Sequence, residues 1–430
     1  MTFAHAAADR PLRLVVLSFE GPDPYAQVGG LGVRVSGLVR AAAELGIETH
    51  LIFVGDPDAP PGEVHAGGRL LLHRWCQSIS RHHPVGVYDG ERGKVQDFAA
   101  GVPPFVASLV REAIVEGRDA VVLAEEWQTA EALCRVVDLL GAEGAARRAR
   151  FVWNCNHPMC LDKVDWDRLR ERALITTVSR YMHGRLREVG IDATVIPNGI
   201  PASMLMPAPQ QQVEALGDLL SDRISLVKVG RWDPDKAWLQ AVEAVALLKE
   251  AGAPARLLMR GGREPHGAEV LRRCRDLGLS VRDVTLGGQG VDALLGGFAA
   301  GRGADVLNLR FPLTEDFKRL VFRAGDAVLA NSSMEPFGLV GLEAMAAGGV
   351  AVVGSTGEDY ANHENVLRVV RGTSAELAGV IATLAGDSDL ERRLRTAGPA
   401  AACRYTWERV LATAFLPTVR PIADSAGLTS

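Results

Sequence analysis

The sequence lacks several features that would place a chain of 430 residues in a specialised class. Its six cysteines are spread over the whole length, which is typical of reduced, cytoplasmic proteins rather than of a disulfide scaffold. No continuous apolar run reaches the roughly 18 to 20 residues that a membrane span needs. The short apolar run 14–19 lies behind charged residues and does not resemble a secretory signal. We therefore expect a cytoplasmic protein without a transmembrane segment.

Charge of one sign is also not in large excess. Lys and Arg number 47 against 52 Asp and Glu, so the net charge is -5, which argues against nucleic acid as a partner. Hydrophobic residues make up 47% and charged residues 23%, which is ordinary for a globular protein. The length predicts about two domains, each with its own core.

Short apolar or β-branched runs alternate with helical patterns along the chain. Such continuous runs are typical of buried parallel strands, and helices between them imply right-handed crossovers. The expected strands lie at 14–17, 49–54, 120–123, 151–153 and 175–178, and then at 224–229, 255–259, 305–309, 327–330 and 350–353.

The pattern restarts after a Pro/Gly cluster at 196–201 and a polar stretch at 207–212. We therefore predict an α/β protein with two doubly wound, Rossmann-like domains, 1–205 and 206–400, that face each other across a cleft. The last segment, 401–430, is expected to hold a helix that crosses back to the first domain. Ligands of such sheets lie beyond the carboxyl ends of the strands.

The stretch from Glu335 to Glu343 is the most informative motif. The two carboxylates stand eight positions apart, where the expected strand 327–330 gives way to a helix. Pro336 suits the first helical position, and free N–H groups at a helix start can hold an anion. The arrangement suits a ligand with both phosphates and hydroxyls, such as a nucleotide sugar. The spacing alone is explained equally well without a ligand, if one carboxylate caps the helix and the other is an ordinary Glu at a buried edge.

Two loops that follow strands carry further candidate groups. Arg231 and Lys236 leave one loop, where a guanidinium and an ammonium could together neutralise a departing diphosphate without a metal. A solvated pair in a surface turn is the alternative. Gly29 and Gly30 lie in a glycine-rich turn after the first strand, where the backbone can come close to phosphates. This turn is not a dinucleotide-binding fingerprint.

Polar residues follow two other strands of the first half. Glu125 and Glu126 come after one of them, and acidic residues at a helix start usually complement the helix dipole. Asn156 and His157 come after the next, where polar groups are expected to point into the cleft. Two cysteines flank His157, but their spacing fits no usual zinc site, so no metal is expected.

Together these motifs resemble retaining glycosyltransferases of the GT-B fold, the group that includes glycogen and starch synthases, sucrose synthase and many bacterial hexosyltransferases. The resemblance covers nearly the full length, and the E-x7-E stretch followed by Ala-Met-Ala-Ala-Gly is its most specific part. The matching segments are 335–348, Arg231 with Lys236, 29–31, 126–128 and 198–200.

The resemblance implies a role for each candidate. The second domain would bind the nucleotide and the first much of the acceptor. Glu335 would accept hydrogen bonds from the donor sugar, Glu343 would hold the ribose, and Arg231 and Lys236 would stabilise the leaving diphosphate. Backbone groups facing the sugar and the phosphates would come from Gly29, Gly30, Phe337, Gly338 and Leu339.

Two departures from the glycogen synthases are visible in the first domain. Gln27 stands where those enzymes often carry Lys before the glycine loop. Asn156 and His157 compete for the place of a histidine that touches the donor sugar, and we favour His157. Both departures weaken the case for α-glucan elongation, but they do not weaken the case for hexosyl transfer.

We therefore expect a retaining hexosyltransferase that moves a hexosyl unit from a nucleotide-diphosphate sugar to a hydroxyl of a sugar, glycan or small molecule. No cofactor and no metal are expected, and the leaving phosphate itself would take the acceptor proton. The alternatives are glycogen synthase-like elongation of an α-glucan and a catalytically silent sugar- or nucleotide-binding regulator. A Rossmann dehydrogenase is a further alternative, but the sequence lacks the dinucleotide-binding fingerprint that it would need. The donor base, the hexose, the acceptor and the oligomeric state stay open.

Overall fold

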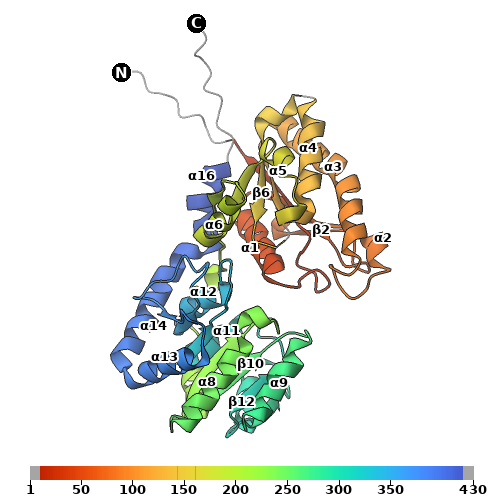
Figure 1. Ribbon diagram of the computed structural model, residues 1–430. Coiled ribbons are helices and arrows are strands. Elements are labelled where there is room, and N and C mark those ends of the chain that lie inside the picture. Colours follow the sequence, from red (N-terminus) through yellow and green to blue (C-terminus); the bar gives the residue numbers. More distant parts are fainter. Residues whose placement is uncertain (1–9, 143, 160, 420–430) are drawn as a thin grey trace, which may run out of the picture. The chain divides into compact units, whose positions relative to one another are not determined.

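The computed structural model describes residues 10–142, 144–159 and 161–419 (Figure 1). The chain divides into two compact units, of which unit 1 comprises Met1–Gly199 with Trp407–Ser430 and unit 2 comprises Ile200–Thr406. The two divisions fall a few residues from the expected boundaries at 205 and 400. Unit 2 is thus one continuous piece of chain, whereas unit 1 is made of two.

Unit 1 is built on an eight-stranded sheet with the strand order β3-β4-β2-β1-β5-β6-β7-β8. All neighbouring strands are parallel except β3 and β4. The strands are β1 (Leu12–Leu17), β2 (Glu48–Val54), β3 (Gly62–His65), β4 (Leu70–Trp75), β5 (Asp119–Glu125), β6 (Ala149–Cys155), β7 (Leu174–Thr177) and β8 (Thr194–Val195).

Helices cover this sheet, and α3 and α4 lie side by side on it (Figure 1). The helices of unit 1 are α1 (Gly30–Glu44), α2 (Gln77–Ser80), α3 (Glu91–Val115), α4 (Trp127–Gly141), α5 (Trp166–Arg170), α6 (Arg180–Glu188), α15 (Trp407–Val410) and α16 (Leu416–Val419). Every residue of β1 is buried, because helices shield both faces of the central strands.

Unit 2 repeats the plan with a seven-stranded, all-parallel sheet of order β11-β12-β10-β9-β13-β14-β15. Its strands are β9 (Ile224–Val229), β10 (Ala255–Arg260), β11 (Val281–Val284), β12 (Val306–Leu309), β13 (Ala327–Ala330), β14 (Ala351–Val353) and β15 (Leu367–Arg368). Its helices are α7 (Gln210–Leu220), α8 (Trp238–Glu250), α9 (His266–Asp276), α10 (Gly290–Ala300), α11 (Glu315–Ala324), α12 (Leu339–Ala346), α13 (Ser374–Gly386) and α14 (Ser388–Ala402).

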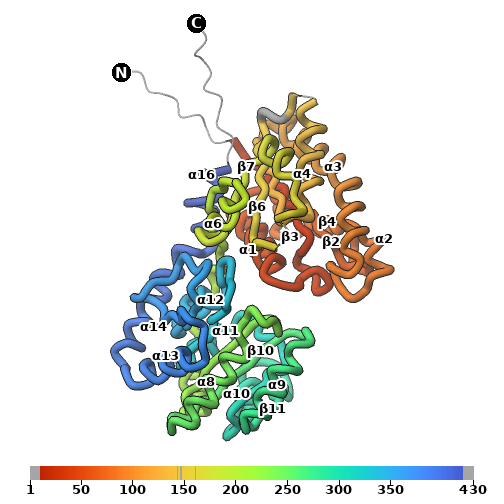
Figure 2. Tube along the Cα trace, viewed as in Figure 1, coloured from red at the N-terminus to blue at the C-terminus, as the bar shows by residue number. Residues whose placement is uncertain are grey.

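Residues 407–419 of the expected returning segment belong to the core of unit 1, where the blue end of the trace runs beside β6 (Figure 2). Residues 401–406 belong to unit 2, and 420–430 lie outside the described residues. Trp407 fills a notch that only glycine leaves open. A Cβ atom added to Gly37 would lie 2.2 Å from the Trp407 ring, and one added to Gly199 would lie 2.5 Å from it. This tryptophan therefore packs the returning chain against α1 and against Gly199, the last residue of the first segment of unit 1.

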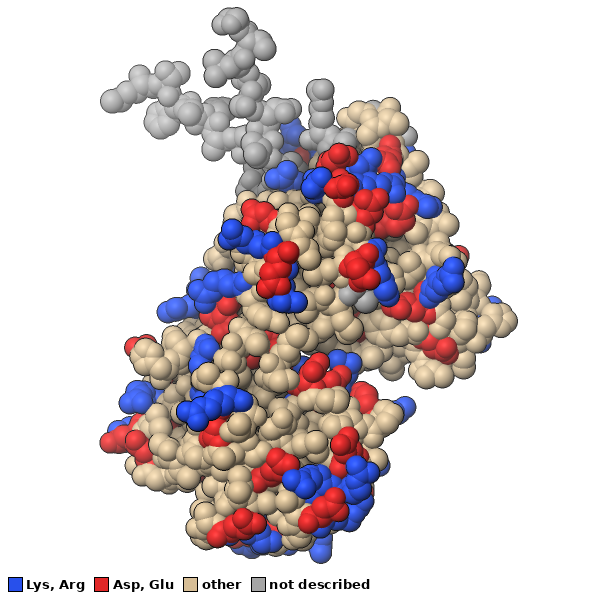
Figure 3. Space-filling model, in the orientation of Figure 1, with Lys and Arg blue, Asp and Glu red and all other residues tan. Residues whose placement is uncertain are grey.

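Helix α3 is the only described helix that is long and apolar enough to cross a membrane, and half of its apolar window is buried within the protein. Helices in the cores of soluble proteins share these properties. The absence of a transmembrane segment therefore stays a prediction. On the face shown in Figure 3, Lys and Arg are interspersed with Asp and Glu over both units.

Candidate functional site in unit 2 and polar clusters in unit 1

The carboxyl ends of β9 and β13 bring together two loops that lie about a hundred residues apart in the sequence. The two strands are neighbours in the sheet, so both loops leave the same edge. Lys236 in the first loop donates to Glu335 Oε2 in the second at 2.6 Å. The N–H of Ser333 donates to the carbonyl of Asp235 at 2.9 Å. The structure thus joins a predicted cation to a predicted carboxylate.

Arg231 lies on the same loop as Lys236, and its side chain is 47% exposed. Its nearest carboxylate, Asp233, is 3.8 Å away, which makes this a weak ion pair. The backbone beside it is firmly held, because Trp238 Nε1 donates to the Arg231 carbonyl at 2.7 Å. A fixed backbone with an exposed guanidinium suits a group that binds an incoming anion.

Helix α12 begins at Leu339, three residues later than the sequence predicts. The expectation that Pro336 occupies the first helical position is therefore wrong. Gly338 has φ 78° and ψ 62°, a left-handed conformation that ends the preceding turn and caps the helix. The N–H groups from Leu339 onward form the first helical turn, and such groups have no acceptor within the helix.

The turn before α12 is braced by the segment 354–360 that follows β14. The Thr356 hydroxyl accepts from the Glu335 N–H at 2.8 Å and donates to the Glu335 carbonyl at 3.0 Å. Gly357 donates its N–H to the same carbonyl at 2.8 Å, and a Cβ there would lie 2.1 Å from the Pro336 oxygen. Tyr360 donates its hydroxyl to the Gly338 carbonyl. The sequence analysis missed this brace.

Two side chains near this turn are deeply buried. The Phe337 ring packs with Tyr360 and Tyr405, with ring centroids 5.7 and 6.1 Å away, so only its backbone can face a ligand. Glu358 is 3% exposed, and burial raises its pKa to about 7. Its Oε2 accepts from the Thr356 N–H at 3.0 Å. Glu358 would therefore be half neutral near pH 7.

Glu343 lies in α12 and is 7% exposed. Lys318 of α11 donates to both of its carboxylate oxygens at 2.9 Å. The sequence analysis missed Lys318, whose position in an amphipathic helix gave no functional signal. A carboxylate has about four acceptor sites, so this bridge leaves capacity for ribose hydroxyls.

In unit 1, the glycine turn is occupied by a carboxylate of the protein itself. Glu20 Oε2 accepts from the N–H groups of Gly29 and Gly32, each at 3.0 Å, and from that of Val28 at 3.2 Å. Helix α1 begins at Gly30, where an added Cβ would meet nothing within 4 Å. The role of Gly29 and Gly30 towards a diphosphate stays a prediction, and Glu20 would have to share the Gly29 N–H.

Glu126, at the carboxyl end of β5, has a backbone that only glycine adopts easily, with φ 66° and ψ 169°. Neighbouring groups enforce it, since Trp153 Nε1 donates to the Glu126 carbonyl at 2.9 Å. Its side chain accepts from the Asn156 N–H at 2.6 Å. Burial raises the pKa of Glu126 to about 8. Interpreting Glu126 only as a dipole complement missed this strained, buried acid.

Asn156 and His157 face different surroundings. The Asn156 amide group donates to Glu125 Oε2 at 2.7 Å, in a buried cluster that also contains Arg34 and Asn154. The His157 ring is half-buried, and its Nδ1 accepts from the Met159 N–H at 3.1 Å. Both residues are half-buried, so the choice of His157 over Asn156 as the residue that touches the donor stays a prediction.

Within the described residues, no group of three or more His, Cys, Asp or Glu could hold a metal ion. The sequence does contain Asp-x-Asp stretches, including Asp233 and Asp235 in the Lys236 loop. There, Asp233 Oδ1 accepts the Asp235 N–H at 3.0 Å and caps a 3-10 turn, Pro234–Lys236. That stretch therefore has a local structural role.

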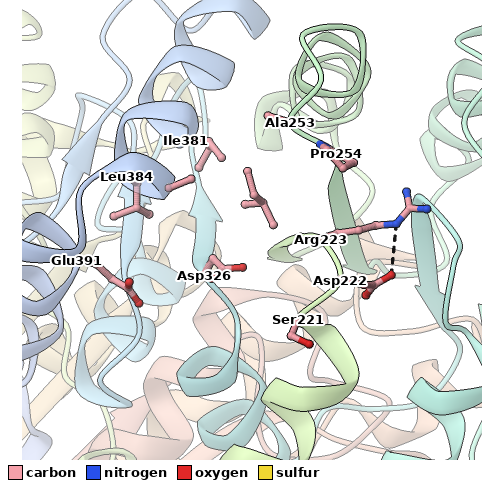
Figure 4. Close-up of a pocket in the computed structure, with 11 residues that line it drawn as sticks. Ser221, Asp222, Arg223, Ala253, Pro254, Asp326, Ile381, Leu384 and Glu391 are labelled. Atoms are coloured by element: carbon pink, nitrogen blue, oxygen red, sulfur yellow. Dashed lines mark ion pairs between the residues drawn. The ribbon is translucent and has the colours of Figure 1, made fainter.

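A hollow of about 400 Å³ lies at the opposite edge of the same sheet. Its lining includes Ile224, Pro254 and Asp326, which start or precede β9, β10 and β13 (Figure 4). Arg223 and Asp222 form an ion pair there at 3.6 Å. Since ligands of doubly wound sheets lie at the carboxyl edge, this hollow is separate from the candidate site.

Comparison with known proteins agrees with this architecture. No family model matches the chain. It is 24% identical over 443 residues to D-inositol 3-phosphate glycosyltransferase from Nocardia farcinica, covering 93% of this chain and 87% of that protein.

Two solved structures share the fold. Sucrose-phosphate synthase from Thermosynechococcus elongatus matches with a TM-score of 0.65 and 20% identity, over 94% of this chain and 97% of that one. Anabaena HepE in complex with UDP-glucose matches with a TM-score of 0.62 and 18% identity, over 94% and 98%. The fold is therefore GT-B, as the resemblance implied. The relatives show that the chain is an enzyme of the glycosyltransferase class.

Proposed function

We propose that this enzyme transfers a hexosyl unit from a nucleotide-diphosphate sugar to a hydroxyl, with retention of the anomeric configuration. The observation that carries the proposal is the 2.6 Å contact between Lys236 and Glu335 at the carboxyl edge of the second sheet. It joins a cation suited to a leaving diphosphate to a carboxylate suited to sugar hydroxyls, beside the open start of a helix.

The remaining roles in unit 2 follow from position. Arg231, exposed on the same loop, adds a second cation for the diphosphate. The backbone of Phe337, Gly338 and Leu339 faces the sugar and phosphate, and Glu343 holds the ribose in addition to Lys318. No metal is required, because the cations neutralise the charge that develops on the leaving group.

In unit 1, His157 contacts the donor sugar from the acceptor side, and Gly29 and Gly30 approach the diphosphate. A phosphate oxygen of the departing nucleotide takes the proton of the attacking hydroxyl. The acceptor is a sugar, a glycan or a small polyol. The name of the relative from Nocardia farcinica makes inositol 3-phosphate the first acceptor to test.

The test is a panel of UDP, GDP and ADP sugars, each with and without inositol 3-phosphate, hexose phosphates and an α-glucan. The expected result is release of one nucleoside diphosphate that depends on one acceptor, with a product whose anomeric carbon has the donor's configuration by NMR. An inverted product would overturn retention. Absence of nucleotide release with every donor would favour the silent binding protein.

Lys249→Ala supplies a matched control for the cation variants. Lys249 is also in unit 2 and pairs with Asp305 at 2.9 Å, but it lies in the last turn of α8, away from the two loops. Loss of nucleotide release in Lys236→Ala but not in Lys249→Ala would link the activity to the proposed site.

A further inference from the structure

Lys228 is a lysine in an unusual place, the middle of the second sheet. It lies in β9, between Val227 and Val229, and is 2% exposed. Strands that are covered on both faces normally carry apolar residues throughout. A buried ammonium needs compensation, since its transfer from water is strongly unfavourable.

The direct partners of Lys228 carry no charge. Its Nζ donates to Asn331 Oδ1 at 2.7 Å and to the Leu329 carbonyl at 3.2 Å. It also lies 5.3 Å from the centroid of the Trp238 ring. Asn331 begins the loop that carries Glu335, and Trp238 follows Lys236 closely. Lys228 therefore contacts the end of the first loop, at Trp238, and the start of the second, at Asn331.

The charged groups that act on Lys228 are Lys236, which repels it, and Glu335, which attracts it. Glu335 is already paired with Lys236 at 2.6 Å, so this trio contains two cations and one carboxylate. Burial and the repulsion by Lys236 lower the pKa of Lys228 to about 7. An anion that binds beside Lys236 would supply the missing negative charge.

We propose that Lys228 is a positioning residue of the donor site. It lies buried beneath the Lys236–Glu335 pair, and the bound diphosphate stabilises its charged form. This inference rests on the proposed function. When the diphosphate binds, the neutral amine of Lys228 takes a proton from solvent and becomes an ammonium. The ammonium holds Asn331 and so fixes the loop that presents Glu335.

The test is calorimetric titration of UDP, GDP and ADP into the full-length enzyme at pH 8, in buffers that differ in ionisation enthalpy. The wild-type enzyme is expected to take up close to one proton per bound diphosphate, because the folded-state pKa near 7 rises on binding. In Lys228→Met this uptake is lost, and affinity falls about tenfold or more.

Two further variants separate charge from structure. Lys228→Arg keeps a permanent cation, so affinity is expected to recover while proton uptake does not. Asn331→Asp places a carboxylate against Lys228, so the ammonium exists before binding and uptake again disappears. Lys94→Met is the control, since Lys94 is a fully buried lysine of unit 1, and it should leave proton uptake unchanged.

The outcomes distinguish this inference from the proposed function. Unchanged proton uptake in Lys228→Met, or in Asn331→Asp should Lys228→Met fail to fold, would overturn the role of Lys228 and leave the donor site intact. Absence of binding by all three diphosphates to the wild-type enzyme would overturn the donor site and the inference together.

Discussion

The carboxyl edges of the two sheets differ in the balance of their charged side chains. In unit 2 that edge carries the cations Lys236 and Arg231 above the buried Lys228, and of these three only Lys236 has a close carboxylate partner. In unit 1 it carries carboxyls, and both Glu20 and Glu126 are held by backbone N–H groups. The cationic edge suits an anionic leaving group, and the acidic edge suits a neutral hydroxyl compound. In the proposed function, one fold would thus serve two chemistries through its loops alone.

Removing a cation from unit 2 should produce the largest effect. We expect Arg231→Ala and Lys236→Ala each to lower turnover about 10²–10³-fold, since one charge-assisted contact to a transition-state diphosphate contributes roughly 2–4 kcal/mol. Steady-state kinetics with the accepted donor measures this, with Lys249→Ala as the control. Near-normal turnover in both variants would erase the contrast between the two edges.

The two carboxylates of unit 2 should differ from each other. Glu335→Gln is expected to lower turnover about tenfold to a hundredfold, because Glu335 lies beside Lys236 and, in the proposed function, contacts the reacting sugar. Glu343→Gln should instead raise the donor KM about tenfold, because ribose contacts persist from ground state to transition state. Unchanged kinetic constants with a lowered melting temperature would reduce both residues to a packing role.

The acidic edge of unit 1 can be tested through stability. The pKa of Glu126 is about 8 in the folded protein, against 4.5 ordinarily, so the folded state binds more protons between these values. The free energy of unfolding should therefore fall as pH rises from about 4.5 to 8, by on the order of a few kcal/mol. The Gln side chain of Glu126→Gln does not titrate. The melting temperature of this variant should therefore rise relative to that of the wild type as the pH increases from 5 to 8.

Glu214→Gln is the matched control for that experiment. Glu214 is exposed on α7 and bonds only to Gln210 among its described neighbours. This variant removes one exposed carboxylate and so measures the effect of losing a surface carboxylate under the same conditions. A Glu126→Gln curve that stays parallel to the wild-type curve would show that Glu126 is charged at neutral pH.

Metal removal should have the smallest effect. In the proposed function the cations of the protein neutralise the diphosphate, so a chelator should leave turnover unchanged. Loss of activity in the chelator, with recovery in magnesium or manganese, would contradict the cationic role of the unit 2 edge. It would also direct attention to Asp233 and Asp235.

The central strands of both sheets could be predicted because they are continuous apolar runs. The edge strands could not, and the sequence analysis also missed β4, which lies inside the first sheet and alternates between buried and half-buried residues. β8 and β15 have two residues each, and β11 carries Arg282 and Asp283 between its valines, so none shows a hydrophobic period.

The candidate site was predictable where residue type and spacing carry the chemistry, as for Glu335 and Lys236. The site could not be predicted where contacts between residues distant in the sequence determine the local structure. The start of α12 is set by Gly338 and by the brace from Thr356 and Tyr360, which lie about twenty residues further on. In the sequence, Lys228 is one polar residue within the expected strand 224–229. Only its burial in the structure suggests the positioning role that we propose.

The way the chain joins the two units has a consequence for engineering. Ile200, the first residue of unit 2, donates its N–H to the carbonyl of Tyr405 at 2.8 Å and bridges to Thr406, the last one. Unit 2 thus begins and ends at one point, which is the arrangement that lets a domain be inserted, excised or exchanged. We therefore expect that residues 200–406 could be exchanged as one unit. A fragment that stops at Gly199 would instead leave the Trp407 notch empty and its glycines without the side chain they accommodate.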